Sequence, residues 1–208
     1  MLAFSRPGDI GSGIEPETQE NPVSIRFVAP GYLLTILLLC IAFAATARPA
    51  HAQQAAPSAP EFTHTDAEEW INSEPLSLSD LRGQVVMLDF WTFDCWNCYR
   101  SFPWLKGLEA RLADADFTVV GVHTPEFAHE RVRANVVAKV GEFELHHPVM
   151  IDNDFSYWKA IGNRYWPTFY VIDKRGRVRG RFIGETHAGD RRARAIESLI
   201  EELLAEPS

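Results

Sequence analysis

The sequence predicts an α/β domain with a central mixed β-sheet flanked by helices. Three short runs of apolar, strand-forming residues predict buried strands, at Val85–Trp91, Phe117–His123 and Thr168–Asp173. Longer segments with helical spacing separate these runs, and strands that are joined through helices lie parallel in one sheet. After the third run, Lys174–Arg177 is typical of a hairpin turn and Val178–Gly184 of a returning strand, which adds an antiparallel edge.

Apolar residues at spacings of three and four predict the helices. The first begins near Cys98, and its apolar face is formed by Phe102, Leu105, Leu108 and Leu112. Pro103 lies inside that pattern, so it either belongs to the first turn or kinks the helix. Phe127–Val140 is expected to be helical, and Asn153–Ile161 to be a short helix. Asp190 is the expected N-cap of a last helix whose apolar face is Ala193, Ile196, Leu199, Ile200, Leu203 and Leu204.

Composition and charge limit the class of protein. Of the 208 residues, 46% are hydrophobic and 23% are charged, which is enough apolar material to close a core without a disulfide framework. The formal net charge is −8, and no run of lysine or arginine interrupts that acidity. Because phosphate binding requires a basic surface, we exclude nucleic acid as a partner.

The N-terminal part of the chain differs in composition from the rest. Gly31–Ala47 is apolar and uncharged, and it is followed by Pro49 and the small-x-small pattern Ala50-x-Ala52. We interpret residues 1–52 as a secretory signal peptide that is cleaved after Ala52. The alternative is an uncleaved membrane anchor through residues 31–47.

Residues 53–60 consist largely of Ala, Pro, Gln and Ser and are expected to form a flexible linker. The domain is then a single unit, residues 61–206. Because it follows a signal or an anchor, we expect it to be periplasmic or otherwise exported, and attached to the inner membrane in the anchored case.

Cys95 and Cys98 are the two cysteines outside the apolar N-terminal region, and they closely follow a buried strand. Their spacing places them at the start of the next helix, where free N–H groups and the helix dipole stabilise a thiolate. The thiolate is the attacking form in thiol–disulfide exchange. Cys95 is therefore the candidate nucleophile, and Cys98 is the candidate residue that resolves the mixed disulfide.

Two other uses of the cysteine pair remain open at this stage. A zinc or iron–sulfur site needs four ligands, but the sequence has no second C-x-x-C and its seven histidines are scattered. A structural disulfide between such close residues closes a very small loop and adds little stability. We therefore favour a redox couple and expect neither a metal site nor a cofactor.

The run V-V-M-L-D-F-W-T-F-D-C-W-N-C, residues 85–98, resembles the active-site strand and turn of the thioredoxin superfamily. The resemblance implies a thioredoxin-like fold and a thiol–disulfide oxidoreductase. In that superfamily an aspartate six residues before the first cysteine is the buried proton acceptor near the resolving cysteine, and the matching residue is Asp89. Burial of a carboxylate raises its pKa and suits it to proton transfer near neutral pH. The alternative is a partly solvated Asp89 with a hydrogen-bond partner.

Trp166-Pro167-Thr168 matches the position of a cis-proline that faces the C-x-x-C in thioredoxin-like proteins. In this fold the residue before that proline offers backbone hydrogen bonds to an extended substrate, so the resemblance implies that Trp166 and Pro167 bind substrate. Trp96 and Asn97, between the cysteines, are the other expected substrate contacts. The alternative is an ordinary trans-proline at the start of a strand.

Three motifs together narrow the resemblance from the superfamily to one subfamily. They are LRGQVVMLDFWTFDCWNC at residues 81–98, HTPEF at residues 123–127 and NRYWPTFYVID at residues 163–173. They are similar to the redoxin-type subfamily of exported thioredoxin-like proteins, which includes the soluble C-terminal region of DipZ-type membrane thiol-reductant transporters and is akin to cytochrome c maturation thioredoxins. The similarity covers about residues 61–184 and implies protein thiols and disulfides as partners. Because the sequence carries no multi-span membrane domain, we expect a separate membrane thiol-reductant transporter as the electron partner.

The expected function is that of an exported reductant, with the haem-binding cysteines of apocytochrome c as a target that the resemblance implies. Two alternatives use the same residues. Thr92-x-x-Cys95 matches the T-x-x-C core of peroxiredoxins, although Leu88 stands where those peroxidases carry a proline. Soft thiolates also suit Cu(I), and a copper metallochaperone would recruit His187 as its third ligand.

Overall fold

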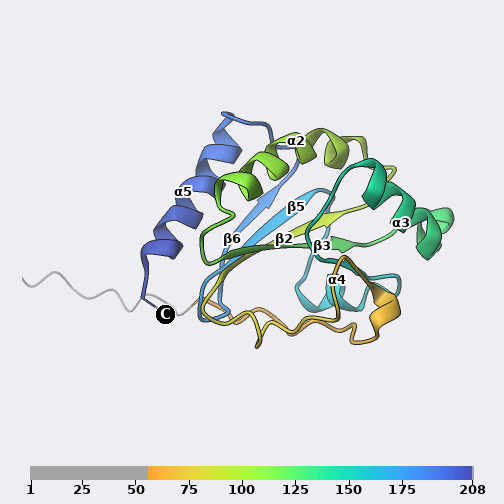
Figure 1. The fold of residues 1–208 in the computed structure, drawn as a ribbon, viewed down its shortest axis with the longest axis horizontal. Helices are drawn as coiled ribbons and strands as arrows, with labels where there is room; N and C mark the ends of the chain where they lie inside the picture. The colour runs from red at the N-terminus through yellow and green to blue at the C-terminus, as the bar shows by residue number, and fades with distance from the viewer. Residues whose placement is uncertain (1–55, 208) are drawn as a thin grey trace, which may run out of the picture. The chain divides into compact units, whose positions relative to one another are not determined.

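One six-stranded mixed sheet organises the part of the chain that the computed structural model describes, residues 56–207 (Figure 1). Its strands are β1 (Trp70–Ile71), β2 (Val85–Trp91), β3 (Phe117–His123), β4 (Val149–Ile151), β5 (Thr168–Ile172) and β6 (Val178–Ile183). Their order across the sheet is β1-β4-β3-β2-β5-β6. The predicted fold class, a mixed sheet flanked by helices, is confirmed, and β2 and β3 have the predicted bounds.

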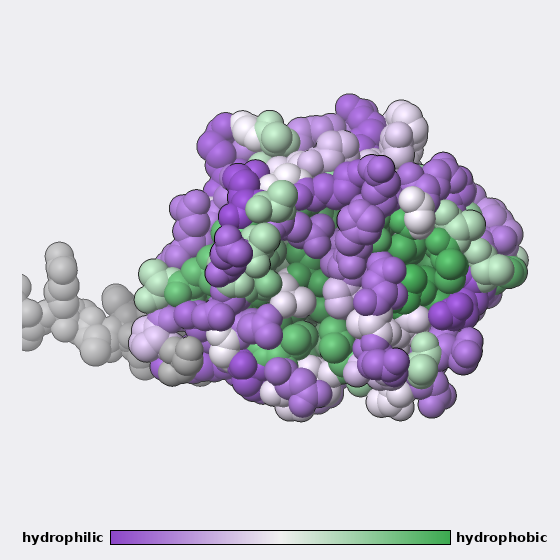
Figure 2. Space-filling view, in the orientation of Figure 1, coloured by the Kyte–Doolittle hydropathy of each residue, from purple (hydrophilic) through white to green (hydrophobic). Residues whose placement is uncertain are grey.

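Helices cover both faces of this sheet (Figure 1). One face carries the longer helices, which are α2 (Trp96–Arg111), α3 (Arg133–Glu142) and α5 (Arg191–Ala205). The other face carries α4 (Ser156–Ala160), and two 3-10 turns, η1 (Ala67–Glu69) and η2 (Ala128–Arg131), lie in the connections. Figure 2 shows hydrophobic residues across the middle of the visible face, with mostly hydrophilic residues above and below them.

β2 is buried along its whole length, and its alternating side chains contribute to two separate hydrophobic clusters. The side chains that pack with α2, α3 and α5 are Val85, Met87 and Trp91. The side chains that pack with α4 and with the chain before β2 are Val86, Leu88 and Phe90. β2 is therefore the strand around which both halves of the core are built, and it leads directly to the cysteine pair.

The direction of β5 differs from our expectation. β3 and β4 run parallel to β2, but β5 pairs with β2 in the antiparallel sense, with Thr168 opposite Phe90. A parallel crossover must return the chain along the full length of the sheet. α4 has five residues and spans only about 8 Å, which is too short for such a return. The chain therefore enters β5 at the same end of the sheet at which β4 finishes. β6 then pairs antiparallel with β5, as the hairpin predicts.

Four further elements differ from the prediction. β1 and β4 were missed because strands of two and three residues are too short to show a period. The single helix expected at Phe127–Val140 is wrong, because the extended backbone of Val132 separates η2 from α3. Pro103 lies in the interior of α2, which begins at Trp96, two residues earlier than expected.

The structure also bears on the N-terminal segments. Pro57–Ala59, within the expected linker, pairs with the β5–β6 hairpin: Ala59 N–H donates to Gly176 at 2.9 Å, and Val178 N–H donates to Pro57 at 2.8 Å. Hydrogen-bonded structure therefore begins ahead of Glu61. The expected signal peptide or anchor, residues 1–52, lies outside the described residues. In the described part of the chain, no helix is both long and apolar enough to cross a bilayer.

A buried histidine connects the chain before β1 to the end of β4. His64 bonds Asp152 Oδ1 through Nε2 at 3.0 Å and Glu69 Oε1 through Nδ1 at 2.7 Å. Asp152 in turn accepts the backbone N–H groups of Tyr157 and Trp158 at the start of α4. The hydrogen bond to Asp152 is the main cause that raises the pKa of His64 to about 9; Glu69 adds to the rise, and burial opposes it.

His64→Gln should remove a pH-dependent part of the stability. Because the folded-state pKa of His64 lies above its ordinary value of 6.5, the stabilisation is fully present below pH 6.5 and is lost as the pH rises through 9. We expect the variant to lose roughly 3 kcal/mol of unfolding free energy at pH 6 and little at pH 10. Urea unfolding across this pH range measures the difference, with the exposed His146→Gln as control. Equal losses at both pH values would contradict this assignment.

Candidate active site

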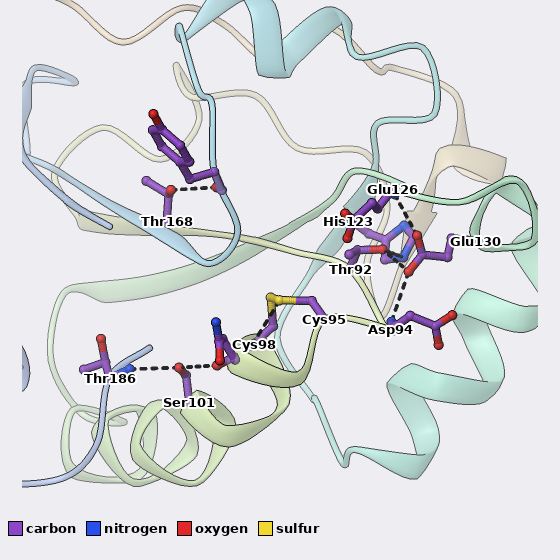
Figure 3. Close-up of a disulfide and its surroundings, with 12 residues drawn as sticks. Thr92, Asp94, Cys95, Cys98, Ser101, His123, Glu126, Glu130, Thr168 and Thr186 are labelled. Atoms are coloured by element: carbon purple, nitrogen blue, oxygen red, sulfur yellow. Dashed lines mark hydrogen bonds between the residues drawn. A yellow bond between two sulfur atoms is a disulfide. The ribbon is translucent and has the colours of Figure 1, made fainter. Parts of the chain in front are cut away.

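The cysteine pair lies where β2 passes into α2 (Figure 3). Cys95 is the N-cap of α2 in an extended conformation, and Cys98 follows on the first turn. The two form a disulfide with a Cα–Cα distance of 5.3 Å, and Cys98 N–H donates to Cys95 Sγ at 3.2 Å. No acidic residue occupies the first turn of α2. The same N–H group and the helix dipole would stabilise Cys95 as a thiolate after reduction.

The two sulfurs differ in their access to solvent. Cys95 is half-buried and borders a surface cleft of about 390 Å³, whereas Cys98 is only 1% exposed. Trp96 and Asn97, between them, are exposed, and Trp96 stacks on Tyr99 with ring centroids 5.4 Å apart. This arrangement allows an external disulfide to reach Cys95 and leaves Cys98 for attack from inside.

Asp89 is enclosed in the sheet beneath α2. It lies between Met87 and Trp91 on the face of β2 that packs in the same cluster as Cys98, and it is 1% exposed. Its Oδ1 has no hydrogen-bond partner among the described residues, so the alternative of a partly solvated, hydrogen-bonded Asp89 is wrong. Burial raises the pKa of Asp89 to about 7; the charge of His147 lowers it and that of Glu109 raises it, both by smaller amounts. This carboxyl group can therefore exchange a proton near neutral pH.

The Trp166–Pro167 peptide bond is cis, so the alternative of a trans-proline is wrong. Pro167 is buried, and its carbonyl accepts a hydrogen bond from Gly184 N–H at 2.8 Å. Trp166 and Cys95 both pack against the cluster that contains Cys98. The indole of Trp166 lies on Trp158, with ring centroids 4.4 Å apart, so the aromatic side chain that this loop exposes is that of Tyr165. Trp166 is half-buried, and its backbone and Pro167 stay the predicted substrate contacts.

A sequence model of the Redoxin family matches residues 54–199, which include the cysteine pair, Asp89 and the cis-proline. The chain belongs to the Redoxin family.

Individual relatives agree with this assignment. The chain is 39% identical over 138 residues to Protein DipZ of Mycobacterium tuberculosis, which covers 65% of this chain and 19% of DipZ. It is 38% identical over 133 residues to human NHL repeat-containing protein 2, covering 62% of this chain and 18% of that protein. Thiol-disulfide oxidoreductase YkuV of Bacillus subtilis is 26% identical over 147 residues, 71% of this chain and 94% of YkuV. The chain thus spans less than a fifth of the two longer relatives.

Solved structures support the fold. A crystal structure of a thioredoxin-like superfamily protein has a TM-score of 0.65 at 26% identity, covering 74% of this chain and 99% of the other. A thiol:disulfide interchange protein DsbE from Chlorobium tepidum has a TM-score of 0.61 at 25% identity, covering 73% and 99%. The fold is therefore thioredoxin-like. The Cys95–Cys98 disulfide thus lies in a thioredoxin-like, Redoxin-family domain whose relatives include proteins named thiol-disulfide oxidoreductases.

The Redoxin-family site also contains a residue that sequence reasoning missed. Glu130 is fully buried, and its carboxylate accepts the Thr92 hydroxyl and the backbone N–H groups of Asp94, Glu126 and Phe127 (Figure 3). Burial alone would raise the pKa of Glu130, but these four donors outweigh it and hold the pKa below its usual value. Glu130 thereby fixes the loop that leads from β2 to Cys95. Its partner Thr92 is 38 residues away, and in the sequence Glu130 is simply an acid within a segment that was expected to be helical.

The peroxidase alternative depends on Thr92, and the copper metallochaperone alternative depends on His187. The Thr92 hydroxyl donates to Glu130 and contacts His123 Nε2 at 3.3 Å, so its hydrogen is already used. His123 is buried, and burial lowers its pKa to about 4, which keeps it neutral. His187 is exposed and bonds Glu185. Among residues 56–207, the cluster of His, Cys, Asp and Glu that is compact enough for a metal ion is His64, Asp152 and Asp154, which excludes both cysteines.

Glu130→Ala should destabilise the protein strongly, because four donors would lose their acceptor in a buried site. We expect a loss of about 3–5 kcal/mol of unfolding free energy. Urea unfolding measures the loss. Exposed Glu126→Ala, in the same loop, is the matched control and should be nearly neutral. A Glu130→Ala protein as stable as the control would overturn the assignment.

Asp89→Asn should stabilise the oxidised protein in a pH-dependent way. The folded-state pKa of Asp89 is about 7 against an ordinary value of 3.8, so the folded state loses stability as the pH rises from 3.8 through 7. An uncharged amide avoids this loss, and we expect a gain of roughly 4 kcal/mol at pH 8 that vanishes near pH 4. Denaturant unfolding of both proteins at the two pH values measures it. A gain that is independent of pH would contradict the raised pKa.

Proposed function

We propose that this protein is an exported reductant of protein disulfides, with Cys95 as nucleophile, Cys98 as resolving cysteine and Asp89 as proton acceptor. The observation that carries the proposal is the position and burial of these three residues. A half-buried Cys95 caps α2, and a buried Cys98 lies in the same cluster as the residues that flank a buried Asp89.

The reaction follows from this arrangement. The Cys95 thiolate attacks a disulfide of the partner, a bond forms between Cys95 and one partner sulfur, and the other partner sulfur leaves as a thiolate. Cys98 then gives its thiol proton to Asp89 and attacks Cys95 Sγ. The Cys95–Cys98 disulfide forms, as the structure has it, and the second partner thiolate is released. The partner gains two electrons, and a separate dithiol must reduce the protein again.

The partner polypeptide is proposed to lie in the surface cleft beside Cys95. Trp96, Asn97 and the backbone of Trp166 and Pro167 are the proposed contacts. The stacked rings of Trp96 and Tyr99, exposed by 66% and 47%, support this placement because exposed aromatic side chains bind extended chains well.

The direction of electron flow and the location are part of the proposal. Similarity to DipZ and to proteins named ResA and DsbE supports a reductant outside the cytoplasm, fed by a separate membrane thiol-reductant transporter. The haem-binding cysteines of apocytochrome c are the proposed target. Export would depend on residues 1–52, as a cleaved signal peptide or as an anchor through residues 31–47.

The redox potential of the Cys95–Cys98 pair tests the proposal. We expect the full chain, equilibrated in graded thiol buffers, to show a reversible two-electron transition at or below about −200 mV. Cys98→Ser should trap the mixed disulfide with a partner, whereas Cys40→Ser, the third cysteine of the chain, should behave as the parent protein.

Other outcomes would reassign the function. A potential near that of strong disulfide oxidants, about −120 mV, would make the protein a disulfide donor. Catalytic turnover of hydrogen peroxide would favour the peroxidase, and tight one-to-one Cu(I) binding without a reversible transition would favour the metallochaperone.

A further inference from the structure

Three buried polar atoms without hydrogen-bond partners among the described residues belong to side chains near Gly121 of the sheet. They are Asp89 Oδ1, Trp91 Nε1 and His147 Nε2. Asp89 lies opposite Gly121 on β3, and Gly121 lies opposite Val149 on β4. A Cβ atom at Gly121 would lie 3.0 Å from Trp91 Nε1 and 3.2 Å from His147 Nε2. The missing side chain at position 121 thus lets both nitrogens approach the sheet on the side of Asp89.

His147 connects these buried atoms to the solvent-facing side of the domain. Its Nδ1 lies 3.1 Å from both carboxylate oxygens of Glu109, on α2. The side chain of His147 is 2% exposed, whereas that of Glu109 is 27% exposed. Both line a surface cleft of about 290 Å³, which does not include either cysteine. The imidazole therefore has one nitrogen on the buried side and one bound to a carboxylate that faces water.

We propose that His147 and Glu109 form the path by which the proton on Asp89 leaves the protein and returns to it. The proposal rests on the proposed role of Asp89 as acceptor of the Cys98 proton. The large majority of buried side-chain polar atoms have a hydrogen-bond partner, but Nε2 of His147 has none among the described residues. Since Nδ1 donates to Glu109, Nε2 carries the free lone pair and can accept a proton.

The proton balance closes over one redox cycle. When Cys98 attacks Cys95, its proton passes to Asp89, then to Nε2 of His147, and the proton on Nδ1 leaves through Glu109 to water. When an external dithiol reduces the disulfide again, one proton moves inward along the same path to the Cys98 thiolate. The inward step also restores the starting tautomer of His147.

The charges around Asp89 are few, so their effects can be separated. From α2 the facing groups are Glu109 and the Cys98 thiol, and from the segment before β4 the facing group is His147. The neighbours of Asp89 in β3 and β5 are Gly121 and Phe169, which carry no charge. His147 and Glu109 act on the pKa of Asp89 in opposite directions.

The test compares His147→Ala and Glu109→Gln with His146→Gln in the full chain. His146 is adjacent, exposed and borders the same cleft, so it is the matched control. Reduced protein is mixed with excess glutathione disulfide, and formation of Cys95–Cys98 is followed in a single turnover. We expect His147→Ala to slow resolution by Cys98 about 10- to 100-fold at pH 7, and added imidazole to restore the rate in proportion to its concentration.

Carbon-13 NMR of the Asp89 carboxyl group is the second measurement. The pKa of Asp89 should fall in Glu109→Gln, because this variant removes a negative charge that raises it. If His147→Ala does not fold, the single-turnover rate of Glu109→Gln decides the matter, since the Glu109 side chain is 27% exposed; resolution at the parent rate would overturn the path. His146→Gln should leave both rate and titration unchanged.

The outcomes separate the two proposals. If the parent protein forms no Cys95–Cys98 disulfide with glutathione disulfide, the proposed function fails. If the parent protein reacts but His147→Ala resolves at the parent rate, or is slow without rescue by imidazole, the proton path is overturned.

Discussion

Complete burial of β2 is the constraint on which the rest of the structure depends. Both faces of this strand pack into hydrophobic clusters, and both of its edges are paired, with β3 and with β5. A strand held on four sides cannot shift its register without moving apolar side chains from one cluster to the other. The end of β2 therefore fixes where α2 begins and so fixes Cys95 as its N-cap. The same burial places Asp89 on the side of α2 and removes it from water.

Two carboxyl groups near the cysteines show how burial can have opposite chemical results. Glu130 is buried but accepts four hydrogen bonds, so it stays ionised and holds the loop before Cys95. Asp89 is buried without such donors, so its pKa rises into the neutral range. A carboxylate that is fully hydrogen-bonded is suited to fixing structure, whereas one that lacks partners is suited to exchanging a proton. Hydrogen bonding, more than burial, separates the two.

Local signals predicted the elements that depend on local chemistry. The apolar runs of β2 and β3, the Asp190 cap of α5 and the hairpin at Lys174–Arg177 could all be predicted because their causes lie within a few residues. The direction of β5 and the short strands β1 and β4 depend on connections across the sheet. Glu130 bonds Thr92 and His147 bonds Glu109, each 38 positions away. The spacing of apolar residues in the sequence cannot reveal pairs that are so far apart. The sequence does not distinguish His147 from its neighbour His146, but the fold buries His147 and leaves His146 exposed.

The geometry of α2 explains why a proton path at the rear of the site is useful. While the mixed disulfide exists, the partner polypeptide is proposed to cover Cys95 and the cleft around Trp96. The proton must leave Cys98 in this state, because the Cys98 thiolate is needed to release the partner. Glu109 lies three turns along α2 from the cysteines, in a cleft that the partner does not need to cover. One helix thus carries the thiol chemistry at its N-terminus and, further along, the exit for the proton, so that a bound partner does not block its own release.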